Sequence, residues 1–283
     1  MTARSTLATE PGMTRSHPLD EIPAQLWRLV TLARHRVLMF DYDGTLAPFR
    51  VERHEANPTP GSIELLRRIA ATGHTTIGIV SGRPLLEVEQ LVGNVPATFV
   101  GEHGWERRAP DGSLLQRPIP PPTQEALTRA FESSNGKPWS ARLERKRTAV
   151  VFHARGLPEA QAAEWSSECE AAWSAIAQEG RVSLDAIQGG IEIRARGCNK
   201  GTAALSLLTH APDGSIGVFV GDDATDEDAF DALRDWGFGI RVGPRTGPTT
   251  AMGTLPSCDA VTAFLTEWLD LTTRPDETPL VPS

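Results

Sequence analysis

The residues from 36 to 40 form an apolar run that is followed at once by the acidic loop Asp41-Tyr-Asp-Gly-Thr-Leu46. A short apolar run without alternation is typical of a strand that is buried on both faces. Gly44 allows the chain to turn sharply after that strand. Similar apolar runs at 75–80 and 216–220 also end in polar loops. We therefore expect a parallel sheet that carries its ligand-binding side chains at the carboxyl ends of its strands.

The middle of the chain has a different pattern from its two ends. At both ends, strand patterns alternate with helix patterns, which predicts a parallel sheet. The middle opens with the hairpin turn Ala109-Pro-Asp-Gly112 and a proline-rich connector, and then has antiparallel character. The elements predicted there are helices at 123–133 and 158–179 and strands at 142–146, 148–155, 181–186 and 190–195.

These patterns predict an α/β protein with a Rossmann-like parallel-sheet core and an inserted α/β cap domain made of an antiparallel sheet plus helices. We expect the core at 21–108 and 198–270 and the cap at 109–197. Residues 1–20 and 271–283 are predicted to be a loose N-terminal arm and a C-terminal tail.

Composition narrows the classes of function. The 283 residues have a formal net charge of −8 and no basic run, which argues against nucleic acid as a partner. No apolar stretch is long enough for a signal peptide or a membrane span, and three scattered cysteines indicate a reduced compartment. We expect a cytoplasmic monomer with no membrane partner.

The acidic loop after the first strand has the residues for phosphoryl transfer. Of two carboxylates two residues apart, one can attack phosphorus and share a magnesium ion, while the other protonates the leaving oxygen and later activates water. Asp41 and Asp43 are the candidates. The alternative is a helix cap or an Asx-turn in an ordinary loop.

A second acidic group, Gly221-Asp-Asp-Ala-Thr-Asp226, follows the run at 216–220. Acids gathered at a strand end are unfavourable unless a cation neutralises them, so Asp222 and Asp226 are candidate metal ligands or supports for one. The alternative is a solvated acidic helix start.

Two further segments offer groups that bind phosphate. Ser81-Gly82-Arg83 lies between a strand and a helix, where backbone N–H groups and a hydroxyl can hold an anion. Asn199-Lys200-Gly201 opens a helix, and its lysine can offset the charge of a transferring phosphoryl group. A solvated lysine at a helix start is the alternative for the second segment.

In order and spacing, these four segments resemble the signature motifs of the haloacid dehalogenase-type phosphohydrolases. The resemblance implies that Asp41 is the nucleophile, that Asp43 is the general acid and base, and that the cofactor is Mg²⁺. It also implies further roles for the residues of these motifs. The phosphoryl group would be held by Ser81, Gly82, Asn199 and Lys200, and the metal by Asp41, the Asp43 carbonyl, Asp222 and, in support, Asp226.

The predicted cap strands place charged side chains on common faces. With a period of two, Glu144 shares a face with Lys146, His153 with Arg155, and Glu192 with Arg194. A face that mixes acids and bases suits a polyol, because carboxylates accept hydrogen bonds and cations donate them. An exposed salt-bridged sheet face is the alternative.

With Gly101-x-His103-Gly-x-Glu106, these strands resemble the trehalose-6-phosphate phosphatase subfamily. The resemblance implies hydrolysis of trehalose 6-phosphate to trehalose and phosphate, the last step of trehalose biosynthesis. The sugar-binding residues would be Arg83, His103, Glu144, Lys146, Arg155 and Glu192. The sequence departs from the subfamily pattern at two places, neither of them catalytic: Glu102 stands where the subfamily usually has a small residue, and Arg194-Ala-Arg196-Gly197 replaces the more usual arginine-proline-x-glycine.

Other functions stay open at this point. The enzyme could hydrolyse another glycosyl phosphate, such as glucosylglycerol phosphate or sucrose phosphate, or less readily act as a mutase. A non-catalytic sugar-phosphate sensor or receiver-like module is a reading of a different class. Receiver domains are about half this length and lack a cap, and a general acid at Asp43 favours turnover.

Overall fold

The computed structural model describes residues 17–244 and 247–273 of the chain. Most of the predicted arm and tail therefore lies outside the described residues. Residues 17–20, which we had placed in the arm, form a turn closed by a hydrogen bond from the Asp20 N–H to the His17 carbonyl. Residues 271–273 belong to the last helix rather than to the tail, and the Thr272 and Thr273 hydroxyls donate to the Leu269 carbonyl of that helix.

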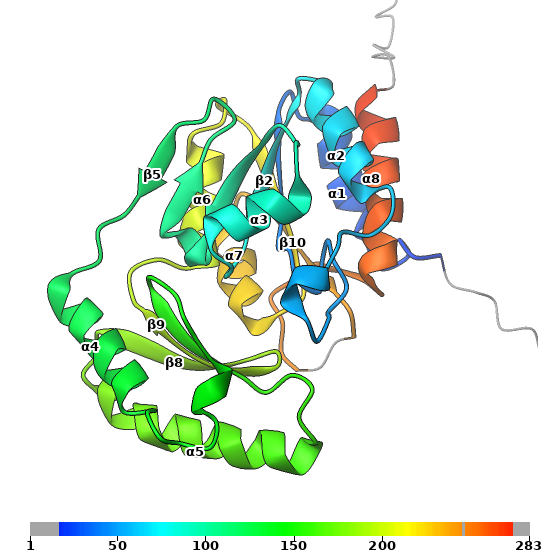
Figure 1. The fold of residues 1–283 in the computed structure, drawn as a ribbon. Coiled ribbons are helices and arrows are strands. Elements are labelled where there is room, and N and C mark those ends of the chain that lie inside the picture. Colours follow the sequence, from blue (N-terminus) through cyan, green and yellow to red (C-terminus); the bar gives the residue numbers. More distant parts are fainter. Residues whose placement is uncertain (1–16, 245–246, 274–283) are drawn as a thin grey trace, which may run out of the picture.

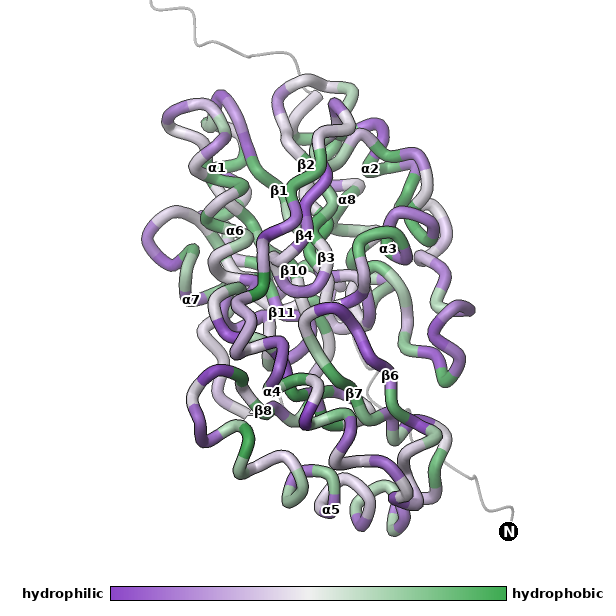
Figure 2. The backbone as a smooth tube through the Cα atoms, turned by 60° about the vertical axis from the view of Figure 1, so that its left-hand side comes forward, coloured by the Kyte–Doolittle hydropathy of each residue, from purple (hydrophilic) through white to green (hydrophobic). Residues whose placement is uncertain are grey.

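The larger of two sheets has eight strands in the order β12-β11-β10-β1-β2-β3-β4-β5. The strands from β12 to β3 are parallel, and β4 and β5 continue the sheet antiparallel. Their bounds are β1 (Arg36–Phe40), β2 (Thr75–Val80), β3 (Ala97–Gly101), β4 (Glu106–Arg108), β5 (Leu114–Gln116), β10 (Ile216–Gly221), β11 (Gly237–Val242) and β12 (Gly253–Leu255). Figure 2 shows the tube hydrophobic along β2 and hydrophilic along β4, in keeping with a sheet that is buried at its centre and more exposed toward one edge.

Helices cover both faces of this sheet (Figure 1). One face packs against α1 (Ala24–Leu32), α2 (Ser62–Ala71), α3 (Leu85–Val92) and α8 (Cys258–Thr273). The other face packs against α6 (Lys200–Thr209) and α7 (Glu227–Ala232). Because alternate residues of a strand point to opposite faces, Leu38 and Phe40 of β1 enter the first layer, and Val37 and Met39 enter the second.

The smaller sheet has four antiparallel strands in the order β6-β7-β9-β8. It is formed by β6 (Leu143–Arg145), β7 (Ala149–His153), β8 (Val182–Ile187) and β9 (Gly190–Ala195), and it packs against α4 (Pro121–Glu132) and α5 (Glu159–Gln178). Figure 1 shows these two helices on the side away from the larger sheet. Ile191 and Ile193 pack among Trp139 and Trp173 on the helix side, so the alternate residue Glu192 is directed to the core.

The predicted fold class is confirmed: a parallel-sheet core carries a separate antiparallel unit with helices. The domain boundaries stay a prediction. β5 lies inside the range predicted for the cap, yet it pairs with β4 in the larger sheet, because the turn at 109–112 folds it back onto that strand. This pairing favours a later start for the insertion, at the proline-rich connector.

Two local features were not predicted. The second acidic segment forms a 3-10 turn at Ala224–Asp226 ahead of the short helix α7, and the Asp226 side chain accepts the backbone N–H groups of Asp222 and Asp223 there. The short strand β12 was not predicted. In the part of the chain that the structure describes, no helix is both long and apolar enough to cross a membrane.

Candidate active site

Four segments that are distant in sequence meet at the carboxyl ends of the parallel strands. Asp41 follows β1, Ser81 follows β2, Asp222 follows β10, and Lys200 begins α6. The Lys200 Nζ lies 2.9 Å from Asp41 Oδ1 and 2.7 Å from Asp226 Oδ1. The lysine and both carboxylates are buried, so these charges interact with little screening by solvent.

Three carboxylates share this position with the single lysine. Oxygen atoms of Asp41, Asp222 and Asp226 all lie within 4.8 Å of one another. Burial, and then the nearby like charges, raise the pKa values of Asp41 and Asp222 well above the usual range of a carboxyl. One lysine cannot neutralise three carboxylates, and a set of oxygen ligands at this spacing suits a hard divalent cation.

The turn after β1 leaves room for this cluster. Gly44 has φ of +81°, a conformation that side chains rarely adopt. A Cβ atom at this position would lie 2.1 Å from Asp222 Oδ2. Gly44 is therefore needed both for the turn and for the approach of Asp222 to the loop.

Asp43 does not face the metal cluster with its carboxylate. Its two oxygens accept hydrogen bonds from Arg83 Nε and Nη2, each at 2.6 Å. Burial raises the pKa of Asp43, but the hydrogen bonds and charge of Arg83, together with Arg155 and Arg53, outweigh burial and lower it. Arg83 also pairs with Glu87. Arg83, which was predicted to bind sugar, is thus paired with Asp43, the predicted general acid.

The predicted phosphate-binding segment at 81–83 forms the floor of the site together with His103, which lies in the loop after β3. Ser81 Oγ accepts the Arg83 N–H at 3.2 Å. The His103 ring lies so close to Gly82 that a Cβ atom there would be 2.6 Å from His103 Nε2. Only glycine at position 82 leaves space for this ring.

One group of cap residues lies directly above that floor. Lys146 Nζ donates to the Gly82 carbonyl at 2.9 Å and lies 3.2 Å from Glu192 Oε1. Glu192 Oε2 lies 3.1 Å from His103 Nε2. Burial raises the pKa of Glu192, but the Lys146 charge and the His103 hydrogen bond lower it far more, so Glu192 is a carboxylate at neutral pH.

A second group of cap residues lies toward the rim. Glu144 pairs with His153 on the neighbouring strand at 2.8 Å and with Arg53 from the loop after β1. Arg155 stacks on Phe49, with its guanidinium carbon 4.2 Å from the ring centroid. These contacts join the cap to the segment at 48–58 of the core.

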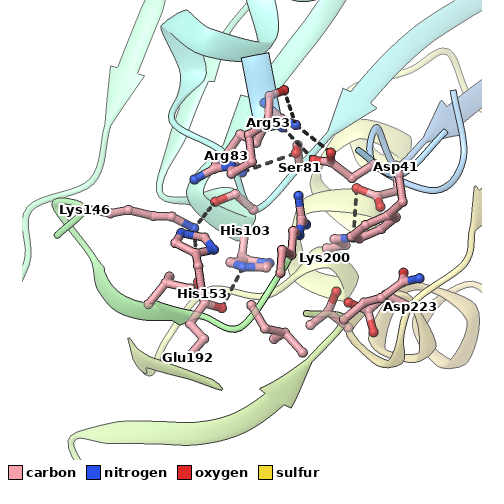
Figure 3. A pocket seen from close by; sticks show the side chains of 18 residues that line it. Asp41, Arg53, Ser81, Arg83, His103, Lys146, His153, Glu192, Lys200 and Asp223 are labelled. Carbon is pink, nitrogen blue, oxygen red and sulfur yellow. Dashed lines mark hydrogen bonds and ion pairs between the residues drawn. The ribbon is translucent and has the colours of Figure 1, made fainter. Parts of the chain in front are cut away.

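Between the two units lies a cleft that is open to solvent (Figure 3). Ten of the predicted site residues line it: Asp41, Asp43, Ser81, Gly82, Arg83, His103, Lys146, Arg155, Glu192 and Lys200. Glu144, Asp222 and Asp226 do not line the cleft but contact or lie close to residues that do.

Asn199 is the exception among the predicted residues. Its side-chain oxygen accepts the backbone N–H of Thr202 at 2.8 Å, and the Thr202 hydroxyl accepts the Asn199 N–H in return. This reciprocal cap satisfies the free N–H groups at the start of α6. The Asn199 side chain therefore caps the helix that carries Lys200 and is not among the residues that line the cleft, and its contact with phosphate stays a prediction.

Several lining residues were not predicted from the sequence. Arg53 and Phe49 lie in an irregular segment without periodicity, Ile187 is the last residue of β8, and Gln188 lies in the turn between β8 and β9. The positive charge of Arg53 was the only signal available for it.

The family model for trehalose-phosphatase matches residues 39–254. A bifunctional trehalose-6-phosphate synthase/phosphatase from Thermoproteus tenax is 35% identical over 226 residues, which are 77% of this chain and 30% of that protein. A trehalose-phosphate phosphatase from Mycobacterium marinum is 31% identical over 237 residues, which are 79% of this chain and 59% of that protein. The chain thus spans less than two thirds of the length of either relative.

Solved structures show the same fold. The C-terminal domain of the Candida albicans trehalose-6-phosphate phosphatase superposes with a TM-score of 0.76 at 23% identity, covering 94% of this chain and 99% of that one. The Aspergillus fumigatus trehalose-6-phosphate phosphatase gives a TM-score of 0.62 at 26% identity, covering 87% and 97%.

Proposed function

Because the chain belongs to the trehalose-phosphatase family, we propose that it hydrolyses trehalose 6-phosphate to trehalose and phosphate through a phosphorylated Asp41. The observation that carries this proposal is that two sets of side chains, one from the core and one from the cap, line the same cleft. Asp41, Ser81 and Lys200 form its floor, and the charged cap residues Lys146 and Glu192 stand over that floor. The floor suits a phosphoryl group, and the cap face suits a polyol.

The chemistry divides into two steps. In the first step an Asp41 oxygen attacks phosphorus, the bond from phosphorus to the sugar oxygen breaks, and a protonated Asp43 gives its proton to that oxygen. In the second step water attacks the phosphorus of the aspartyl phosphate, Asp43 takes a proton from the water, and phosphate leaves with Asp41 restored. Asp43 must leave Arg83 before either transfer: the bidentate pair keeps Asp43 ionised, which prevents it from donating a proton, and occupies both of its oxygens, which prevents it from accepting one.

The acidic cluster fits a magnesium ion. Asp41 and Asp222 would hold it, Asp226 would support them, and the family resemblance adds the Asp43 carbonyl. Bound magnesium would supply positive charge that offsets the charge developing on the phosphoryl oxygens. Lys200, which pairs with Asp41 and Asp226, would add positive charge that stabilises the same phosphoryl oxygens.

Sugar recognition belongs to the cap. Glu144, Lys146, Arg155 and Glu192 would exchange their present contacts for sugar hydroxyls. Lys146 and Glu192 now pair with each other, and Glu144 pairs with Arg53. Each such exchange replaces one hydrogen bond by another, so the hydroxyls are bound without leaving a buried charge unpaired.

The test is phosphate release from a panel of esters with magnesium present: trehalose 6-phosphate, sucrose 6-phosphate, glucosylglycerol phosphate and glucose 6-phosphate. We expect trehalose 6-phosphate to have the highest kcat/KM, and Asp41→Asn to abolish turnover with an unchanged thermal midpoint. A rate on trehalose 6-phosphate no higher than on glucose 6-phosphate would reject the substrate. Turnover by the Asp41→Asn variant would reject the nucleophile.

A further inference from the structure

Glu102 is a buried acid that the proposed chemistry does not use. It follows β3, its residue is 3% exposed, and it lies one residue before His103. Its Oε2 accepts the Thr148 N–H at 2.8 Å and also accepts the Thr148 hydroxyl. Among the described residues, no lysine, arginine or histidine pairs with it. A buried carboxylate held by neutral donors alone is unfavourable in itself, which calls for another reason to place it there.

The backbone at this position is strained as well. Glu102 has φ of 45° and His103 has φ of 57°, and among the described residues they are the only ones other than glycine with positive φ. The strain directs two consecutive core side chains into the cap: Glu102 reaches Thr148, and His103 reaches Glu192. Strained residues of this kind cluster at functional sites, where the surrounding contacts maintain them.

Thr148 lies where the cap's ligand-binding strands meet. It belongs to the turn between β6 and β7, which is closed by the Lys146 N–H donating to the Ala149 carbonyl at 2.9 Å. The Thr148 carbonyl accepts the Ala195 N–H from the end of β9 at 2.8 Å. Lys146 precedes this turn and Glu192 lies on β9, so a shift of Thr148 moves both residues.

The neighbouring residue strengthens the same attachment. Arg147 Nε lies 3.2 Å from Glu106 Oε1, and its two terminal nitrogens donate to the carbonyls of Arg117 and Trp105. The turn is thus fixed to the core through side chains on both of its central residues. Of these, Thr148 is the buried one, being 2% exposed.

We infer that Glu102 is a positioning residue: its contact with Thr148 sets the cap turn so that Lys146 and Glu192 stand over the phosphate-binding floor. The inference rests on the proposed function. The ligand it serves is the sugar part of the ester, because Lys146 and Glu192 contact that floor from the cap, through Gly82 and His103. A phosphate ester with a small planar leaving group makes no such use of the cap.

The experiment compares trehalose 6-phosphate with phenyl phosphate in Glu102→Ala, Glu102→Gln and Thr148→Val. Glu102→Ala should lower kcat/KM for trehalose 6-phosphate by about tenfold or more, mainly through KM, and change phenyl phosphate by less than about twofold. Glu102→Gln should restore most of the loss, since its amide oxygen can accept the same donors. Glu179→Ala, which removes an exposed glutamate on the outer side of the cap, is the matched control and should change neither substrate.

A double variant separates the contact from general damage. Thr148→Val removes the hydroxyl donor, and it should lower the trehalose 6-phosphate rate in the wild-type background but add little to Glu102→Ala. Equal losses on both substrates, or additive losses in the double variant, would overturn the inference. If Glu102→Ala does not fold, an unchanged substrate preference in Thr148→Val would overturn it. Failure of the proposed function would instead appear in the unsubstituted protein, as a lack of preference for trehalose 6-phosphate.

Discussion

At the scale of single residues, the cleft is dominated by charges that already have partners. Asp43 is held by Arg83, Glu144 by Arg53 and His153, and Glu192 by Lys146. A side chain in such a pair has a defined position before any ligand arrives. A ligand that uses one of these groups must therefore replace the hydrogen bonds of its present partner.

Glu144 gives a prediction for stability. Burial raises its pKa, but the His153 hydrogen bond and the charges of Lys146 and Arg53 lower it from 4.5 to about 2. A pKa that is lower in the folded state stabilises the fold above about pH 4.5, and this contribution is lost as pH falls toward 2. Glu144→Gln should therefore cost about 1–3 kcal/mol at pH 7 and about half of that or less at pH 3.

Urea unfolding of the two proteins at pH 7 and pH 3 measures this difference. The control is Glu179→Gln, whose carboxylate lies in an exposed pair with Arg129. A stability difference for Glu144→Gln that does not depend on pH would contradict the assigned pairing.

At the scale of elements, the cap has an apolar core of its own. Trp173 of α5 is fully buried against Trp139, and its indole N–H donates to the Ala130 carbonyl at 2.9 Å. We expect Trp173→Ala to destabilise the protein by about 3–5 kcal/mol, because it leaves a large cavity. Trp236→Ala, at a side chain that is 63% exposed, should change stability by less than about 0.5 kcal/mol.

Thermal unfolding followed by tryptophan fluorescence would check this pair. A Trp173→Ala variant as stable as Trp236→Ala would show that the cap helices do not depend on this cluster.

The elements also show what the sequence could predict. β1, β2 and β9 begin and end where predicted, because uniform or alternating apolar patterns mark strands directly. The carboxyl ends of parallel strands share one edge of a sheet, so the meeting of Asp41, Ser81 and Asp222 followed from topology alone.

The pairing of side chains could not be predicted from the sequence in the same way. Asn199 has the same residue type whether it binds phosphate or caps α6, and only the geometry of Thr202 decides between them. Likewise, the pairing of Arg83 with Asp43 joins residues 40 positions apart and depends on rotamers rather than on spacing. β12 was missed because three residues are too few to show a period.

At the scale of the whole molecule, metal binding should connect folding to pH. Burial and like charge raise the pKa values of Asp41 and Asp222, so a proton competes with a cation for these oxygens. Magnesium should therefore bind more tightly as pH rises from 6 to 8, with release of protons. Its addition should raise the thermal midpoint more at pH 8 than at pH 6.

Calorimetric titration in buffers of different ionisation enthalpy would count the released protons. Asp222→Asn should weaken magnesium binding and reduce the pH dependence, whereas Asp231→Asn, in an exposed pair with Arg234, should leave both unchanged. Equal affinity at both pH values, with no proton released, would contradict the linkage.

The pairing of Asp43 with Arg83 has a consequence for selectivity. This pairing keeps Asp43 ionised and occupies both of its oxygens, so filling the cleft alone is not enough for cleavage. An ester that fills the floor without separating these two side chains would block the enzyme instead of being consumed. The enzyme would then select among phosphate esters after they bind. Only esters that separate the Asp43 carboxylate from the Arg83 guanidinium would be cleaved.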